Sequence, residues 1–251
     1  MSSDAGPGTT RDGGRGDGSR GDPAAPVRVG RPRSTPPQAG REPRAEILDA
    51  AAELFTELGY AGTSTRAIAE RVGIKQASLY YHFAGKDELL LELLELSVRP
   101  TLDLVAAVEA RADRPEVALH ALATLDVATL LRAPHNIGTL YQAHEVQQPA
   151  FDGFRRHRAE LLAAYTRLAR ASCPVRPAPP LLGALCLQVV ELVIPLRRDH
   201  PPGELPPGPG VADELAQACL RVVRLPAAAV DAAVTDSRAV LAALSPVAAT
   251  T

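Results

Sequence analysis

Two short amphipathic segments joined by a tight turn constrain the fold of this chain more than any other feature of its sequence. The first segment places Ile68, Ala69 and Val72 on one side of a helix, and the second runs over about 76–82. Gly73 lies in the turn between them, where a residue with a left-handed backbone commonly ends a helix. This spacing is typical of a helix-turn-helix.

A longer amphipathic helix is predicted on each side of this pair. The apolar residues of 44–58 fall at offsets 0, 1, 4, 7, 8 and 11, which form one helix face, and Gly59 is the expected end. The leucines that follow Lys86 predict a fourth helix that reaches about Arg99. The first three helices are expected to share one small core, made of Leu48, Phe55, Ile68, Val72, Leu79 and Phe83.

The exposed face of the third helix carries amide, hydroxyl and aromatic groups, the kinds of group that contact base edges and thymine methyls in the major groove. The helix is too short to be stable alone, so this face is available for a role other than stability. The candidate DNA contacts are Thr65, Arg66, Lys75, Gln76, Ser78, Tyr80, Tyr81, His82 and Lys86. Structural roles compete for three of them: Tyr80 as a core residue, His82 as a helix cap, and Arg66 as the partner of Glu70.

The charge of this region supports DNA binding less strongly than its side-chain types do. Residues 41–99 contain seven Lys or Arg and ten Asp or Glu. The acidic residues gather on the outer faces of the first and fourth helices, whereas Arg66, Lys75 and Lys86 lie near the predicted contact face. The expected affinity is therefore moderate and strongly dependent on salt.

Several short motifs stand at a characteristic spacing in the same region. They are Leu58-Gly59-Tyr60, Thr63-Ser64-Thr65, Ile68-Ala69, Val72-Gly73, Leu79-Tyr80-Tyr81-His82-Phe83 and Lys86-Asp87-Glu88-Leu89-Leu90. Through them, residues of about 44–92 resemble the DNA-binding domain of the tetracycline-repressor (TetR) family, although Ala77 stands where many members have Gly.

The resemblance implies an all-α, homodimeric transcriptional regulator whose C-terminal helices hold a ligand pocket and a dimer interface. At the matched positions it implies phosphate contacts from Thr65, Tyr80, His82 and Lys86. It implies base contacts from Arg66, Gln76 and Tyr81, with Lys75 and Ser78 as further candidates.

The rest of the chain also has a helical pattern, so the predicted fold class is all-α. Helices are expected at about 101–111, 115–132, 134–147, 149–172, 179–198, 210–224 and 227–244. No segment alternates apolar and polar residues over the length of a strand, so no strand is predicted.

Composition divides the chain into four predicted parts. Residues 1–42 are rich in Gly, Pro, Arg and Asp and have little to bury, which predicts a disordered arm. Residues 43–99 form the helix-turn-helix DNA-binding domain, 100–245 the helical effector-binding and dimerisation domain, and 246–251 a frayed tail. The arginines near the end of the arm form either a solvated tail or a basic segment that strengthens binding to a polyanion.

A dimer interface is expected on the C-terminal helices, because the helix over 179–198 is apolar nearly all round. The candidate interface residues are Leu182, Leu185, Val189, Leu192, Leu215 and Val222. A core within one chain is the alternative. A homodimer is also expected because two recognition helices on a palindrome reach a specificity that one short helix lacks.

A pocket for a small-molecule effector is expected between the helices of 101–172 and the helix of 179–198. Its candidate lining is Asp126, Tyr141, His144, Glu145, Phe151, Phe154, Arg158, Gln188 and Glu191. Each of these can instead be a core residue with satisfied hydrogen bonds or a surface residue.

The sequence shows no sign of an enzyme, a cofactor or a metal site. It has no nucleophile elbow, phosphate loop or zinc-protease spacing, and His144-Glu145 lacks the further ligands that zinc needs. With no leader and no apolar span either, a cytoplasmic protein is expected. We expect a dimeric repressor that binds a palindromic operator and is released by a small molecule. The alternative is a DNA-binding protein or an activator without that response.

Overall fold

The computed structural model describes residues 42–200 and 209–244. Every regular element in these ranges is a helix, which confirms the predicted all-α class. Residues 1–41 of the predicted arm and the predicted tail over 246–251 lie outside the described residues. Within the described ranges, no helix combines the length and the apolar character needed to cross a membrane.

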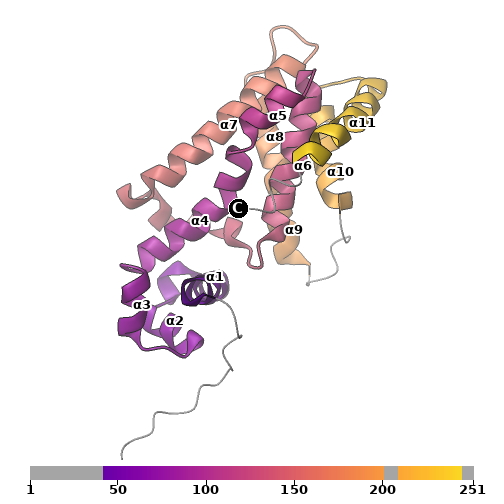
Figure 1. Ribbon diagram of the computed structural model, residues 1–251. Coiled ribbons are helices and arrows are strands. Elements are labelled where there is room, and N and C mark those ends of the chain that lie inside the picture. Colours follow the sequence, from indigo (N-terminus) through magenta and orange to yellow (C-terminus); the bar gives the residue numbers. More distant parts are fainter. Residues whose placement is uncertain (1–41, 201–208, 245–251) are drawn as a thin grey trace, which may run out of the picture. The chain divides into compact units, whose positions relative to one another are not determined.

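The N-terminal helices in Figure 1 are α1 (Pro43–Gly62), α2 (Thr65–Val72), α3 (Gln76–His82) and α4 (Lys86–Leu102). α2 packs against α1 and α3, and α1 also packs against α4. The predicted core is confirmed, with Leu48, Phe55, Ile68, Leu79 and Phe83 buried and Val72 partly buried. Removing these apolar side chains from water stabilises a unit whose third helix is too short to form alone.

Local backbone signals interrupt α1 and end α2 at the glycines that the sequence predicts. Gly59 interrupts α1 with a φ of 74°, outside the range that other residues adopt readily. The Ser64 hydroxyl caps α2 by accepting a hydrogen bond from the Ala67 N–H at 3.1 Å. Gly73 ends α2 in the left-handed conformation, with a φ of 78°. The tight turn that aims α3 therefore follows from residues inside the turn itself.

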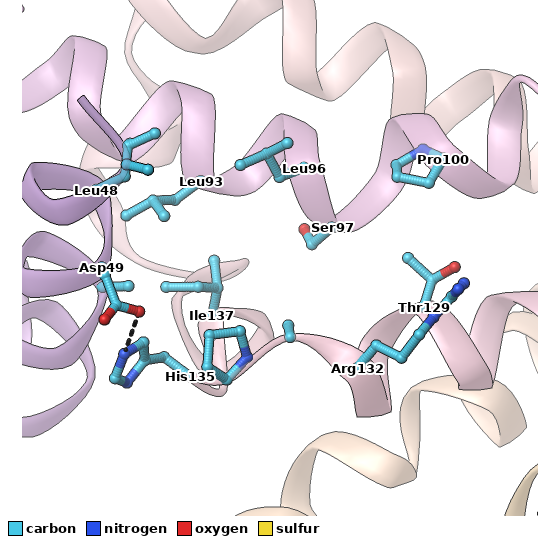
Figure 2. Close-up of a pocket in the computed structure, with 14 residues that line it drawn as sticks. Leu48, Asp49, Leu93, Leu96, Ser97, Pro100, Thr129, Arg132, His135 and Ile137 are labelled. Atoms are coloured by element: carbon cyan, nitrogen blue, oxygen red, sulfur yellow. Dashed lines mark hydrogen bonds and ion pairs between the residues drawn. The ribbon is translucent and has the colours of Figure 1, made fainter. Parts of the chain in front are cut away.

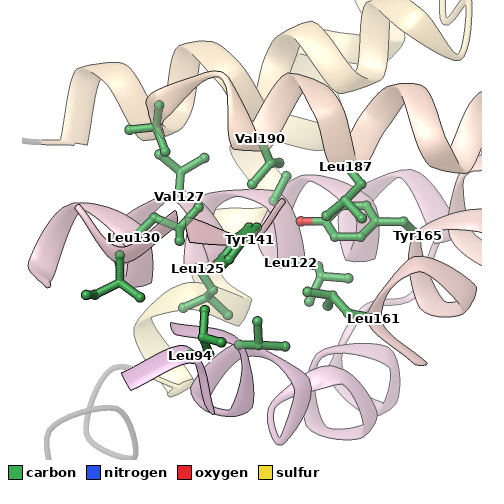
Figure 3. Close-up of a cluster of buried hydrophobic side chains, with 14 of the residues drawn as sticks. Leu94, Leu122, Leu125, Val127, Leu130, Tyr141, Leu161, Tyr165, Leu187 and Val190 are labelled. Atoms are coloured by element: carbon green, nitrogen blue, oxygen red, sulfur yellow. The ribbon is translucent and has the colours of Figure 1, made fainter. Parts of the chain in front are cut away.

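The C-terminal helices surround α6 (Pro115–Arg132). Its neighbours are α4, α5 (Val105–Arg111), α7 (Asp152–Ser172), α8 (Leu182–Glu191), α9 (Val193–Asp199), α10 (Pro209–Val222) and α11 (Ala227–Leu244). Figure 3 shows side chains of several of these helices meeting, including Leu94 of α4, Leu122 of α6 and Leu187 of α8. Because α6 is apolar on nearly every side, it is buried as the central helix of this core.

The segment 134–147 is not the α-helix that its sequence predicts. It forms two 3-10 helices, Ile137–Leu140 (η1) and His144–Gln147 (η2), and a third, Pro149–Phe151 (η3), precedes α7. Contacts with α9 override the helical pattern. The Asn136 amide donates to the Ile194 carbonyl at 2.8 Å, and Gly138 packs directly against the Ile194 side chain.

Two further helix boundaries differ from the predicted ones. The single helix predicted over 179–198 is two helices, α8 and α9, because Pro195 has no N–H to donate to the Glu191 carbonyl. α4, in contrast, continues through Pro100 and past its predicted end at Arg99. It therefore spans the predicted domain boundary and belongs to both parts.

Candidate functional site

The face of α3 opposite its buried anchor is open to solvent. Leu79 is completely buried, whereas Tyr81 is 85% exposed and Tyr80 is 50% exposed. The polar residues exposed with them are Lys75, Gln76 and Ser78. Packing of Leu79 thus determines which side chains α3 presents, and these include most of the predicted DNA contacts.

Three of the predicted contacts form one hydrogen-bonded cluster where α3 meets the start of α2. The Gln76 amide donates to the Thr65 hydroxyl at 2.9 Å, and the hydroxyls of Thr65 and Tyr80 lie 3.2 Å apart. At this end of α2 the first backbone N–H groups have no partner within the helix. The cluster therefore places hydroxyl and amide groups beside donors that suit a phosphate oxygen.

Arg66 forms the ion pair with Glu70 that the sequence offered as its structural alternative. Its Nε lies 2.9 Å from the Glu70 carboxylate, and this hydrogen bond raises the pKa of Arg66. Both side chains are largely exposed, and exposed ion pairs of this kind are held weakly in water. The guanidinium can therefore exchange this partner for another acceptor.

Lys86 lies at the start of α4 with its ammonium turned toward the protein. It donates to the carbonyls of Tyr60 at 2.8 Å and Thr63 at 2.9 Å, and it lies 3.9 Å from the centre of the Tyr60 ring. The Tyr60 hydroxyl in turn donates to Asp87, and burial together with this bond raises the pKa of Tyr60. Two of the three Lys86 donors thus close the end of α1, a structural role that the sequence did not indicate.

Part of the predicted pocket lining forms a polar cluster around Arg158. Its guanidinium lies 2.6 Å from the Glu191 carboxylate and 4.4 Å from the centre of the Tyr141 ring. Gln188 donates to the same carboxylate at 2.8 Å. Phe154 is fully buried, with its ring centre 5.6 Å from that of Tyr141. The polar groups of this cluster pair with one another and its rings pack together. This is the alternative to a ligand-binding role that the sequence left open.

Asp126 is a buried carboxyl group in the middle of α6. It accepts a hydrogen bond from the Tyr165 hydroxyl at 2.9 Å. Burial raises the pKa of Asp126 to about 7, against the opposing effect of hydrogen bonds from Tyr165 and Thr101. The group therefore changes its charge near neutral pH while it is enclosed by the core.

The remaining predicted pocket residues do not join this cluster. His144 is exposed and Glu145 is half-buried on η2, where the helical spacing that linked them to Tyr141 does not exist. Phe151 is fully buried on η3. The unpredicted 3-10 geometry of 137–151 is the physical reason for this correction.

A cavity of about 490 Å³ lies instead between α1, α4, α6 and η1 (Figure 2). None of the predicted pocket residues lines it. Its polar lining includes Asp49, Arg132 and His135, and the His135 ring nitrogen lies 3.2 Å from the Asp49 carboxylate. No sequence spacing links residues so far apart, and the unpredicted turn over 133–137 brings them together.

The predicted dimer residues divide between the core and the surface. Leu182 and Leu215 are buried within the chain, and Val189 and Val222 are partly buried. Leu185 is 48% exposed and Leu192 46%, and Leu181, which was not predicted, is 65% exposed. Gly183 allows α8 to pack closely against α7, because a Cβ at this position would lie only 2.4 Å from the Thr166 Cα. This contact leaves Leu185 on the outer face of α8 exposed, and the exposed Leu181 and Leu192 flank the helix at helical spacing.

Comparison with known proteins relates both halves of the chain to regulators. Residues 47–93 match the sequence model of "Bacterial regulatory proteins, tetR family". The crystal structure of AmtR from Mycobacterium smegmatis is 40% identical in sequence, with a TM-score of 0.72, over 82% of this chain and 98% of that one.

Two curated relatives match a short part of the chain. The transcriptional repressor KstR2 of Mycobacterium tuberculosis is 49% identical over 51 residues, 20% of this chain and 26% of that protein. The transcriptional regulator AcrR of Shigella flexneri is 40% identical over 60 residues, 24% of this chain and 28% of that protein. The chain thus matches about a quarter of the length of these curated relatives.

Proposed function

The chain belongs to the tetR family of bacterial regulatory proteins, and from this premise we propose that it is a dimeric transcriptional regulator that binds operator DNA through α3. The observation that carries the proposal is the exposed aromatic and amide face of α3 beside the start of α2. Regulators of this family are not enzymes, in agreement with the sequence prediction.

The side chains of this face suit two kinds of contact. Thr65 of α2 and Tyr80 of α3, whose hydroxyls lie 3.2 Å apart, would contact phosphate oxygens. His82 and the third Lys86 donor would be further phosphate contacts. Arg66, Gln76 and Tyr81 are exposed and would contact base edges, with Lys75 and Ser78 as further candidates. Phosphate contacts would position α3, and the base contacts would supply sequence preference.

A second copy of the chain is the proposed partner at the outer face of α8. Leu181, Leu185 and Leu192 expose apolar surface there that a two-fold symmetric contact would remove from water. Such a dimer presents two α3 helices to one side of a duplex. Half-sites about one helical turn apart then contribute jointly to affinity and specificity.

Repression relieved by a small molecule is the proposed mode of regulation. KstR2 is described as a repressor and IcaR of Staphylococcus epidermidis as a negative regulator. A reporter gene behind the operator should be silent with the protein and active when the effector is added. Higher reporter expression with the protein than without it would identify an activator. Repression that no small molecule relieves would identify a DNA-binding protein without this response.

Tyr81→Ala should weaken binding to a specific duplex by about 1–3 kcal/mol without unfolding the protein. Tyr81 is almost wholly exposed, so its removal costs contacts to DNA and little packing within the chain. The duplex is selected from a random library by the wild-type protein, and affinity is measured by fluorescence anisotropy.

Val175→Ala provides the matched control for this experiment. It also shortens an exposed apolar side chain, but after α7 and away from α3. Its affinity should equal that of the wild type, and both variants should keep the wild-type circular dichroism spectrum. Wild-type affinity in Tyr81→Ala would show that DNA contacts another face.

A further inference from the structure

We propose that the cavity between α1, α4, α6 and η1 is the effector site, and that it takes a small organic acid with an apolar body. Its volume of about 490 Å³ lies within the range of about 300–1,000 Å³ that is usual for small-molecule sites. The role of this ligand as an effector rests on the proposed function, whereas its binding does not.

The walls of the cavity favour an apolar ligand body. Leu48 of α1, Leu93 and Leu96 of α4 and Ile137 of η1 line it, as the sticks in Figure 2 show. Leu96 is 56% exposed, so a hydrocarbon group lying against it would remove both surfaces from water. This apolar wall is formed by α1, α4 and η1.

Arg132 supplies the charge that selects an acid. Its side chain lies at the α6 end of the cavity in Figure 2, and its Nε donates to the Ala128 carbonyl at 3.3 Å. Among the described residues it has no acidic partner, although many other arginines of the chain have one. A guanidinium without an acidic partner can bind the carboxylate of a ligand through two parallel hydrogen bonds.

Asp49 of α1 pairs at the opposite end of the cavity with His135, which precedes η1. A ligand held at Arg132 and packed against Leu48 would therefore touch both α6 and α1. Because α1 packs against α2 in the DNA-contacting unit, its position bears on where α3 lies. A ligand with different affinity for two positions of α1 would change operator affinity by that difference.

Isothermal titration calorimetry with hexanoate, octanoate and dodecanoate tests the site on the full chain without DNA. We expect saturable binding that strengthens with length, because each buried methylene adds about fourfold in affinity. The alcohol 1-octanol should bind at least about tenfold more weakly than octanoate, since it cannot form the charge-assisted pair.

Two variants and a matched control locate the ligand. Arg132→Gln should lower octanoate affinity about tenfold and leave 1-octanol unchanged. Ala45→Phe adds a ring at an exposed residue that lines the cavity and should abolish binding of both probes. Arg111→Gln is the control, because Arg111 is also an exposed arginine at a helix end that donates to the carbonyl four residues earlier. It should bind octanoate like the wild type.

Absence of saturable carboxylate binding would overturn the proposed site. Equal binding of octanoate and 1-octanol, or an Arg132→Gln variant with wild-type affinity, would overturn the assignment to an acid. Octanoate should also lower operator affinity of the wild type at least about tenfold, and leave that of Arg132→Gln almost unchanged at the same concentration. A failure of the chain to bind any operator would defeat the proposed function and leave the calorimetric result in place.

Discussion

Leu185→Glu should convert the protein to a monomer and lower its affinity for a palindromic operator by about 10²–10⁴-fold. The substitution places a carboxylate between Leu181 and Leu192, the exposed leucines that flank α8, where a second copy would bury it without a partner. Each separated chain would then hold the duplex through one α3 helix. Sedimentation velocity measures the mass, and fluorescence anisotropy on the selected duplex measures the affinity.

Leu58→Glu is the matched control for this loss. Leu58 of α1 is 56% exposed, so the same change of charge and polarity is made on an apolar surface away from α8. The control should remain a dimer, and both variants should keep the wild-type helical signal. A dimeric Leu185→Glu protein with undiminished affinity would show that the chains associate through another face.

Asp126→Asn should stabilise the protein by about 4 kcal/mol at about pH 8 and by less than half of that at about pH 5. The pKa of Asp126 rises on folding from 3.8 to about 7, so folding takes up a proton between these values. Stability of the wild type therefore falls as pH rises from about 4 to about 7, and the full cost of the buried carboxylate applies above that. Denaturant unfolding at both pH values measures the difference.

Asp103→Asn gives the comparison for an exposed carboxylate, since Asp103 lies at the surface in an ion pair with Arg99. Its stability should depend on pH as that of the wild type does. If Asp126→Asn shows the same pH dependence as the wild type, the carboxylate is not the buried, unfavourable charge described above.

The DNA-contacting helices are the part of the fold that could be predicted most completely from sequence. Their ends depend on Gly59, Ser64 and Gly73, which act through the backbone of their own turn. Leu79 packs inward at the spacing that the helical pattern indicates, so the exposed side chains of α3 follow from the same pattern. Local signals of this kind are visible without knowledge of any distant contact.

The cavity could not be predicted because it depends on long-range packing. The segment 134–147 does not form its predicted helix and packs against Ile194 instead. This arrangement brings His135 to Asp49. The contacts of Lys86 also join residues distant in sequence, because its two carbonyl partners lie at the C-terminal end of α1. In each case, contacts between residues distant in sequence decide the structure, and the local sequence pattern does not show them. Several polar residues of the predicted pocket pair with one another instead of lining a cavity.

Hydroxyl-radical footprinting of the wild-type protein on its selected duplex tests the central claim most directly. Two α3 helices related by symmetry should protect two half-sites about one helical turn apart, and a scrambled duplex of the same composition should show no such pattern. Protection without sequence preference, or of a single half-site by a dimer, would contradict the assignment of α3 as the helix that contacts operator DNA.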